Sequence, residues 1–346
     1  MELAQETFRP RIPVRFIFRD TSGDETVAAQ QLAELAISDR VMGIVGPLVG
    51  NAALGATQRA NQERIPLLTM SQKEGLAASS LYTFRNSLTP QLQVRALLDY
   101  AMEERGFSQF GIMSPQTRQG ENFAAIFREE VIRRGGEVVA EQNYLTDQTD
   151  FRYQVRLLQG LDPNAPDEEE QPKDPDALDN PDAIAAEEEL PPFEALFIPD
   201  YADRISLIAP QLSFYGLEGV QLLGTNGWND AELPRLTRQF TEGAVFTDGF
   251  FRHSEYPFVQ EFVESYFNRY GEEPTILEAQ GYDSAGIMLT LLNDTRVRSR
   301  EDLRRALAQL QNYPGVTGAT RFDFIGEADK ILFLLQVQKG TIVQIN

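Results

Sequence analysis

The sequence contains no cysteine and only one histidine, His253, and these scarcities exclude several kinds of chemistry. Without cysteine there is no disulfide, thiol nucleophile or zinc–cysteine site. A Ser-His-Asp hydrolase would depend on His253 alone, and no G-x-S-x-G elbow accompanies it. We therefore predict a protein that is not an enzyme, with no cofactor and no metal, and we interpret His253 as a surface or crossover residue.

Basic side chains are also scarce, since 31 Lys and Arg stand against 52 Asp and Glu, for a net charge of −21. Such a charge repels phosphate backbones and anionic lipid, so we expect no nucleic-acid partner. No run approaches 18 consecutive apolar residues, which predicts that the chain has no transmembrane segment. A length of 346 residues is sufficient for two domains with ample cores.

Much of the negative charge lies in one insertion, residues 161–190, which holds twelve acidic residues, one lysine and five prolines. This composition cannot bury enough apolar area to offset its ordering entropy, so we predict a mobile, solvated loop. Asp174, Asp176 and Asp179 are close enough in sequence to suggest a calcium loop. However, the EF-hand's central glycine and terminal glutamate are absent.

The hydrophobic pattern alternates between strand and helix, which predicts an α/β fold with parallel sheets. A first β-α-β-α-β unit is predicted from residues 11–18, 25–38, 41–45, 51–64 and 65–69, and an irregular crossover from 83–90. A second unit follows from strands 110–113, 137–144, 193–198 and 220–223, with helices 121–134, 150–159 and 202–214. The last third predicts helices 257–270, 278–292 and 302–310 and antiparallel strands 320–324, 330–337 and 341–345.

Two loops follow strands of the first unit, where open α/β sheets bind their ligands. Gly50 and Asn51 begin a helix whose unpaired amides suit a carboxylate, although an ordinary strand-to-helix turn fits the spacing equally well. Ser71 and Gln72 offer hydrogen bonds and Lys73 offers a positive charge. The alternative is that Ser71 caps a helix and Lys73 only faces solvent.

Residues 14–72 resemble the first lobe of the type I periplasmic substrate-binding proteins, the family of the leucine/isoleucine/valine-binding proteins. Residues 14–20 resemble that family's "v-x-x-D-D" strand, 42–47 its "v-I-G-P" and 65–71 its "i-P-x-i-S". The similarity continues through Phe84 to Asn86, residues 106–139 and the stretch FVESYFNRYGEEPTILEAQGYDSAGIML. It covers nearly the whole chain except the acidic insertion.

The resemblance implies a two-lobed clamp of α/β lobes joined by three hinge crossovers, closing on a ligand between them. On this basis we assign residues 1–88 and 250–318 to lobe I, and residues 89–249 and 319–346 to lobe II. In amino-acid-binding relatives, first-lobe loops hold the α-carboxylate and the α-amino group. Carried over by position, those loops are Gly50 with Asn51 and Ser71 to Lys73.

The second-lobe positions depart from the family pattern. Gln119 stands where the family has an aromatic residue, and Thr225 to Trp228, which includes Asn226, stands where amino-acid binders place an acidic residue. Asp200 is then the alternative partner for an ammonium group, and Tyr201 falls near an aromatic contact of the family. Trp228, the only tryptophan, either lines the cleft or packs as a loop aromatic.

Residues 1–4 resemble the end of a helix that follows the family's first, central strand. We therefore expect a longer precursor with an export signal, with or without a lipid anchor, and a periplasmic or outer-envelope location. If the protein lacked that strand, the first sheet would have a gap, or a rearranged order, with unpaired backbone groups.

The leading functional hypothesis is a solute receptor for an amino acid or similar small polar molecule, with the membrane permease of an ABC importer as partner. The alternative is an envelope lipoprotein of the same fold that activates a penicillin-binding protein, with a cell-wall synthase as partner. The substituted ligand positions and the acidic insertion favour the alternative.

Overall fold

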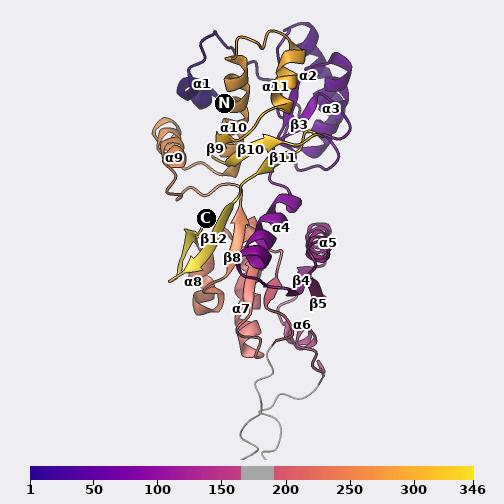
Figure 1. The fold of residues 1–346 in the computed structure, drawn as a ribbon, viewed down its shortest axis with the longest axis vertical. Helices are drawn as coiled ribbons and strands as arrows, with labels where there is room; N and C mark the ends of the chain where they lie inside the picture. The colour runs from indigo at the N-terminus through magenta and orange to yellow at the C-terminus, as the bar shows by residue number, and fades with distance from the viewer. Residues whose placement is uncertain (165–190) are drawn as a thin grey trace, which may run out of the picture. The chain divides into compact units, whose positions relative to one another are not determined.

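The computed structural model describes residues 1–164 and 191–346, so the predictions for the acidic insertion fall largely outside the described residues. The described chain divides into two compact units (Figure 1). Unit 1 comprises Met1–Leu92 and Gly249–Phe333, and unit 2 comprises Gln93–Asp248 and Leu334–Asn346. The chain therefore passes from one unit to the other three times.

Unit 1 contains a three-stranded parallel sheet in the order β1-β2-β3, formed by Ile44–Val45, Leu67–Thr69 and Thr83–Arg85. Its helices are α1 (Glu2–Phe8), α2 (Glu25–Ile37), α3 (Gly50–Glu63), α9 (Pro257–Tyr270), α10 (Ile276–Leu292) and α11 (Arg300–Ala308). An antiparallel sheet of β9 (Tyr313–Gly315), β10 (Gly318–Phe322) and β11 (Ala328–Lys330) completes the unit.

Helices cover both faces of the parallel sheet in unit 1. Ile44 and Leu67 pack in a core with the alanine-rich faces of α2 and α3. Val45 and Leu68 point the other way and pack with α10 and α11. Because successive strand residues face opposite sides, short apolar strands buried on both faces are what this arrangement requires.

The strand predicted for residues 11–18 is wrong: the structure assigns no strand to this segment. Its apolar, β-branched residues have a high propensity for β-strand. Residues 13–20 also form no turn and no helix. However, no neighbouring strand pairs with them within the described residues. Strand formation depends on cross-strand partners as well as on local propensity.

Unit 2 contains a seven-stranded sheet in the order β13-β12-β8-β7-β6-β4-β5. These strands are β4 (Gln109–Pro115), β5 (Glu137–Tyr144), β6 (Ala195–Phe197), β7 (Gln221–Gly224), β8 (Val245–Asp248), β12 (Phe333–Gln338) and β13 (Thr341–Gln344). The pairs among β5, β4, β6, β7 and β8 are parallel, and β12 with β13 is antiparallel. The helices are α5 (Arg118–Arg133), α6 (Arg152–Leu158), α7 (Ala202–Phe214) and α8 (Leu233–Thr237).

Aromatic packing attaches α5 to the sheet of unit 2. Phe127 stacks on Phe197 with ring centroids 4.3 Å apart, and meets Phe110 edge-on at 5.6 Å. All three side chains are fully buried. This core fixes where α5 begins, at the carboxyl end of β4.

The structure differs from the predictions at two of the strands and crossovers and in one assignment of residues to a lobe. The predicted strand 330–337 is two strands, β11 and β12, which belong to different sheets. The expected irregular crossover 83–90 contains β3, and α4 (Pro90–Leu98) follows and carries the chain from unit 1 into unit 2. Residues 319–333 group with unit 1, whereas we had assigned them to the second lobe, because β10 pairs with β9 and β11.

Within residues 1–164 and 191–346, no helix combines the length and the apolar character needed to cross a bilayer. In the same ranges, no group of three or more His, Cys, Asp or Glu side chains is arranged to hold a metal ion.

Candidate functional site

The loop after β2 in unit 1 holds Ser71, Gln72 and Lys73 in a defined turn. The Ser71 amide donates to Thr69 Oγ1 at 3.3 Å, and the Lys73 amide donates to Ser71 Oγ at 3.2 Å. No helix begins here, so the proposed helix cap is absent and Ser71 closes a turn instead. Ser71 is buried, while Gln72 and Lys73 are exposed.

The same loop lies against the start of α3. Thr69 Oγ1 donates to the Pro47 carbonyl at 2.9 Å, which joins the end of β2 to the connection between β1 and α3. A Cβ placed on Gly50 would lie 3.4 Å from Lys73 Cβ. The structure thus brings together Gly50, Asn51 and residues 71–73, which the sequence had only placed after separate strands.

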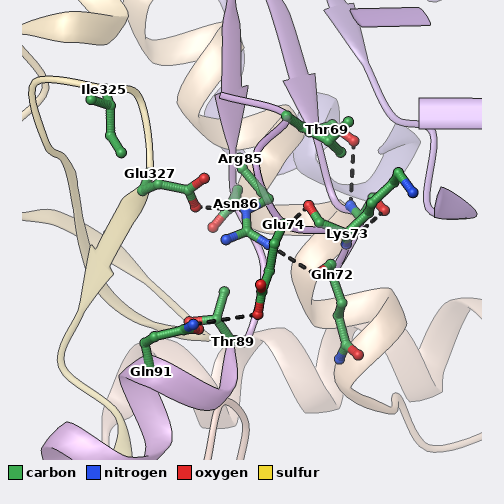
Figure 2. A network of polar contacts seen from close by, with 12 residues as sticks. Thr69, Gln72, Lys73, Glu74, Arg85, Asn86, Thr89, Gln91, Ile325 and Glu327 are labelled. Carbon is green, nitrogen blue, oxygen red and sulfur yellow. Dashed lines mark hydrogen bonds and ion pairs between the residues drawn. The ribbon is translucent and has the colours of Figure 1, made fainter. Parts of the chain in front are cut away.

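Arg85 is the residue that fixes the main chain of this loop (Figure 2). Its Nη1 donates to the carbonyls of Gln72, at 2.9 Å, and Lys73, at 3.1 Å. Its Nε pairs with Glu327 Oε2 at 2.6 Å, and the Arg85 side chain is only 6% exposed. Because Arg85 holds carbonyls, the side chains of Gln72 and Lys73 remain free to face a ligand.

Glu327 comes from the turn between β10 and β11, far from Arg85 in sequence. The Arg85 amide also donates to the Gly326 carbonyl at 2.8 Å, so main chain and side chain are both anchored there. Burial raises the pKa of Glu327, and the hydrogen bond and charge of Arg85 oppose that rise. The ion pair is therefore partly desolvated and depends on both partners.

In unit 2, Gln119, Asp200 and Tyr201 line one pocket of about 230 Å³. It lies at the carboxyl ends of β4 and β6, where α5 and α7 begin. The Tyr201 hydroxyl donates to Gln119 Oε1 at 3.3 Å, and Tyr201 is 54% exposed. Three of the predicted second-lobe residues therefore share a surface that a small ligand can reach.

Asp200 is the half-buried acid of this pocket. It accepts a hydrogen bond from the Tyr144 hydroxyl at 2.7 Å and one from the Tyr201 amide at 2.8 Å. Burial raises the pKa of Asp200, and these two donors partly oppose the rise. Burial, together with the charge of Asp200, also raises the pKa of Tyr144. The carboxylate keeps lone pairs beyond these two bonds, so it can accept a further donor from a ligand.

Gly120 allows α5 to begin close to the end of β4. A Cβ at this position would lie 2.4 Å from the Pro115 carbonyl oxygen, a distance that real structures do not show. The amide of Gly120 is capped by Thr117 Oγ1 at 2.9 Å. Both contacts place Gln119 at the mouth of the pocket.

Asn226 and Trp228 lie outside this pocket's lining. The Trp228 side chain is fully buried against Phe246, and its Nε1 donates to the Ile198 carbonyl at 3.1 Å. Of the two interpretations of Trp228, the structure shows the second, in which the side chain packs in the interior. There it supports the loop after β7. The Asn226 amide donates to Gln93 Oε1 at 2.8 Å.

The sequence analysis did not identify four residues that hold the loop of unit 1 or form the pocket of unit 2, namely Arg85, Glu327, Tyr144 and Arg204. Arg204 lines the pocket and donates to the carbonyls of Thr146 and Gln148. Tyr144 ends a strand that neighbours β4, so its position at a strand's carboxyl end was a usable signal. No such signal exists for Glu327, because its partner lies 242 positions away.

The comparisons with known proteins agree with this architecture. The family model described as "periplasmic binding protein" matches residues 9–341. No protein in the curated set matches the chain. A structure of a putative branched-chain amino acid ABC transporter from Rhodospirillum rubrum is 25% identical with a TM-score of 0.82, covering 99% of this chain and 94% of that one.

Two more distant structures share the fold. LivJ from Streptococcus pneumoniae, in complex with isoleucine, is 20% identical with a TM-score of 0.62, covering 99% of this chain and 92% of that one. A solute-binding protein from Rhodopseudomonas palustris, in complex with 3,4-dihydroxybenzoic acid, is 18% identical with a TM-score of 0.65, covering 99% and 89%.

These matches confirm the resemblance and the fold class inferred from the sequence, a type I fold of mainly parallel sheets flanked by helices. The chain belongs to the periplasmic binding protein family, whose members are non-catalytic receptors.

Proposed function

We propose that the protein is the extracytoplasmic solute receptor of an ABC importer and binds an amino acid or similar small carboxylate. The family match and the likeness to the Rhodospirillum rubrum structure support the transport role. The observation that carries the ligand class is the pocket of unit 2, where the Asp200 carboxylate lies beside the exposed Tyr201 ring.

The chemistry of the two surfaces is complementary to a zwitterion. Asp200 supplies an acceptor for an ammonium group, and Tyr201 supplies an apolar face for a side chain. In unit 1, the amides at the start of α3 and the Lys73 ammonium suit a carboxylate. Each unit therefore offers groups that suit one end of a zwitterion.

Isothermal titration of the full chain tests the proposal, with the twenty amino acids, benzoate and 3,4-dihydroxybenzoate as the panel. We expect at least one amino acid to bind at micromolar concentration or below. Asp200→Asn should then weaken its binding tenfold or more, because the ammonium group loses its counter-charge. Glu129→Gln, an exposed change later in α5, is the matched control and should leave the affinity unchanged.

Absence of heat with every compound would contradict the proposal. If aromatic acids bind and amino acids do not, the transport role stands and the ligand class changes. In that case Asp200→Asn should leave the affinity unchanged or raise it, since these acids carry no ammonium group and a carboxylate repels them.

A further inference from the structure

Tyr144 is a buried side chain that supports the pocket of unit 2 from the end of β5. It is paired with Pro115 of β4, and its carbonyl accepts the Gln116 amide at 2.8 Å. The Tyr144 side chain is buried, with 1% of the residue exposed, and its ring meets that of Phe151 edge-on, with centroids 5.3 Å apart. Strand pairing and ring packing together therefore fix where the Tyr144 hydroxyl lies.

The carboxylate of Asp200 is held by one donor on each oxygen. The Tyr144 hydroxyl donates to Oδ2 at 2.7 Å, and the Tyr201 amide donates to Oδ1 at 2.8 Å. Two donors on different oxygens oppose rotation of the carboxylate about its own axis. One donor ends a strand and the other caps α7, and side chains held by such regular elements keep their geometry without a ligand.

The charged groups of α7 leave the Asp200 carboxylate without an ion pair. Arg204 lines the same pocket and lowers the pKa of Asp200 by its charge, but its guanidinium donates to two main-chain carbonyls of the loop after β5. Asp203 opposes Arg204 with a like charge. Within residues 1–164 and 191–346, Tyr144 is the only side chain that donates a hydrogen bond to this carboxylate.

The other elements packed against Asp200 bring no charged side chain to the pocket. The loop after β7 approaches through Gly227, where an added Cβ would lie 2.7 Å from the Asp200 carbonyl oxygen. The Tyr201 hydroxyl is directed to the amide side chain of α5 and not to the carboxylate. The start of α5 contributes neutral residues only, namely Thr117, Gln119 and Gly120.

The charge of Asp200 therefore depends on Tyr144. Burial raises the pKa of Asp200, and the hydrogen bond from Tyr144 is the largest effect that opposes this rise. Burial and the charge of Asp200 raise the pKa of Tyr144 in turn, so its hydroxyl stays protonated and remains a donor. Without this donor, a half-buried carboxylate would lose part of the solvation of its charge, which favours the protonated form.

We propose that Tyr144 is a positioning residue of the solute site, which orients the Asp200 carboxylate and keeps it ionised for the ammonium group of the ligand. The inference rests on the proposed function, because it takes Asp200 as the partner of an ammonium group. Tyr144 is too buried to touch the ligand and acts only through Asp200. Phenylalanine at this position would fill the same space without offering the donor.

Tyr144→Phe tests the inference first without a ligand. ¹³C NMR of the full chain with labelled aspartate follows the Asp200 carboxyl, and its signal is assigned by its loss in Asp200→Asn. We expect the substitution to raise the pKa of Asp200 by about one pH unit or more. Tyr153→Phe changes a 53% exposed tyrosine of α6 and is the matched control, which should leave that pKa unchanged. An unchanged pKa of Asp200 in Tyr144→Phe would overturn the inference.

Isothermal titration between about pH 5 and pH 8 tests the link to binding. The probe is L-isoleucine or, if another of the twenty amino acids binds more tightly, that amino acid. Tyr144→Phe should weaken binding tenfold or more at the acid end and far less at the alkaline end, where Asp200 is ionised again. In the Asp200→Asn background the same substitution should have no pH-dependent effect. A loss of equal size at every pH would show that Tyr144 only supports packing, and would overturn the inference.

Failure of the proposed function has a different signature. If no amino acid binds the parent protein at any pH, the proposed function fails, and the role of Tyr144 in ligand binding fails with it. The NMR measurement still shows, in that case, whether Tyr144 keeps Asp200 ionised. If an amino acid binds and Tyr144→Phe changes neither the pKa of Asp200 nor the pH dependence, the proposed function stands and this inference alone is wrong.

Discussion

At the residue scale, the ion pair of Arg85 and Glu327 positions the loop of Ser71 to Lys73 through the Arg85 side chain. Arg85 uses one guanidinium nitrogen for two carbonyls and another for the carboxylate, so the loop conformation depends on a side chain that is only 6% exposed. Such a buried pair contributes little net stability, but breaking it leaves an uncompensated charge.

We therefore expect Glu327→Gln to lower the free energy of unfolding by about 3 kcal/mol and to weaken solute binding. Arg321→Gln, which removes an ion pair in the same hairpin with a 56% exposed arginine, is the control and should cost less than about 1 kcal/mol. Urea unfolding and titration measure both effects. Equal costs for the two variants would show that Arg85 is not held by Glu327.

Also at this scale, Glu130 makes a pH-dependent contribution at the end of α5. Hydrogen bonds from Arg133 and Arg134 lower the pKa of Glu130 from its usual range to about 2. A depressed folded-state pKa stabilises the protein above the unfolded-state pKa, and this contribution is lost as the pH falls from about 4.5 toward 2.

Glu130→Gln should thus destabilise the protein at pH 7 by about 1 kcal/mol, a modest amount because solvent screens the pair. The difference from the parent should disappear by about pH 2 to 3, as thermal melts across pH can determine. Glu129→Gln, an exposed change at the neighbouring position, is the control and should leave the melting temperature at pH 7 nearly unchanged. A penalty for Glu130→Gln that stayed constant from pH 7 to pH 2 would show that lost packing, and not charge, is responsible.

At the element scale, the start of α5 depends on a close approach that only glycine permits. Gly120→Ala would place a methyl group 2.4 Å from the Pro115 carbonyl, so α5 must shift and Gln119 with it. We expect a loss of about 2 kcal/mol in stability and weaker solute binding. Gly281→Ala in α10 is the control, because no atom beyond the adjacent residues and the backbone of its own helix lies within 4 Å of the added Cβ.

That control should be stabilising by about 0.5–1 kcal/mol, since alanine is the better helix former. Thermal melts of both variants, with titration of the first, provide the measurements. If both substitutions shifted the melting temperature upward, the close contact of Gly120 with β4 would not exist in solution.

Helices and strands could be predicted from the sequence where the local hydrophobic pattern determines them. They were harder to predict where contacts with residues distant in sequence determine the structure. The sequence ranges 202–214 and 257–270 match α7 and α9, and 137–144 matches β5. In contrast, β8 was missed because the buried run Val245 to Asp248 is too short to show a period. The strand predicted at residues 11–18 is wrong because no strand pairs with this segment within the described residues. The sequence left two interpretations of Trp228 open, because the burial of an aromatic side chain in a loop depends on tertiary packing.

At the scale of the whole molecule, neither unit is a continuous piece of the chain. The sheet of unit 1 is made by residues 44–85, whereas α10 and α11, which cover one of its faces, come from residues 276–308. The candidate site of unit 1 is also built from both segments of the chain, since Arg85 comes from the first segment and Glu327 from the second.

A fragment of residues 1–92 should therefore show no cooperative thermal transition by circular dichroism, because one face of its sheet lacks α10 and α11. Mixing it with a fragment of residues 249–333 should restore a transition. A cooperative melt of residues 1–92 alone would contradict this expectation and show that α2 and α3 suffice.

The same division has a consequence for synthesis. When Thr69 has left the ribosome, about 200 further residues must be made before α10 follows, which takes roughly 10–40 s at ordinary elongation rates. During this interval the side of the sheet carrying Val45 and Leu68 has no helix to cover it. We therefore expect the nascent chain to stay accessible to chaperones during this interval, and unit 1 to become compact only once nearly all of the given sequence has been translated.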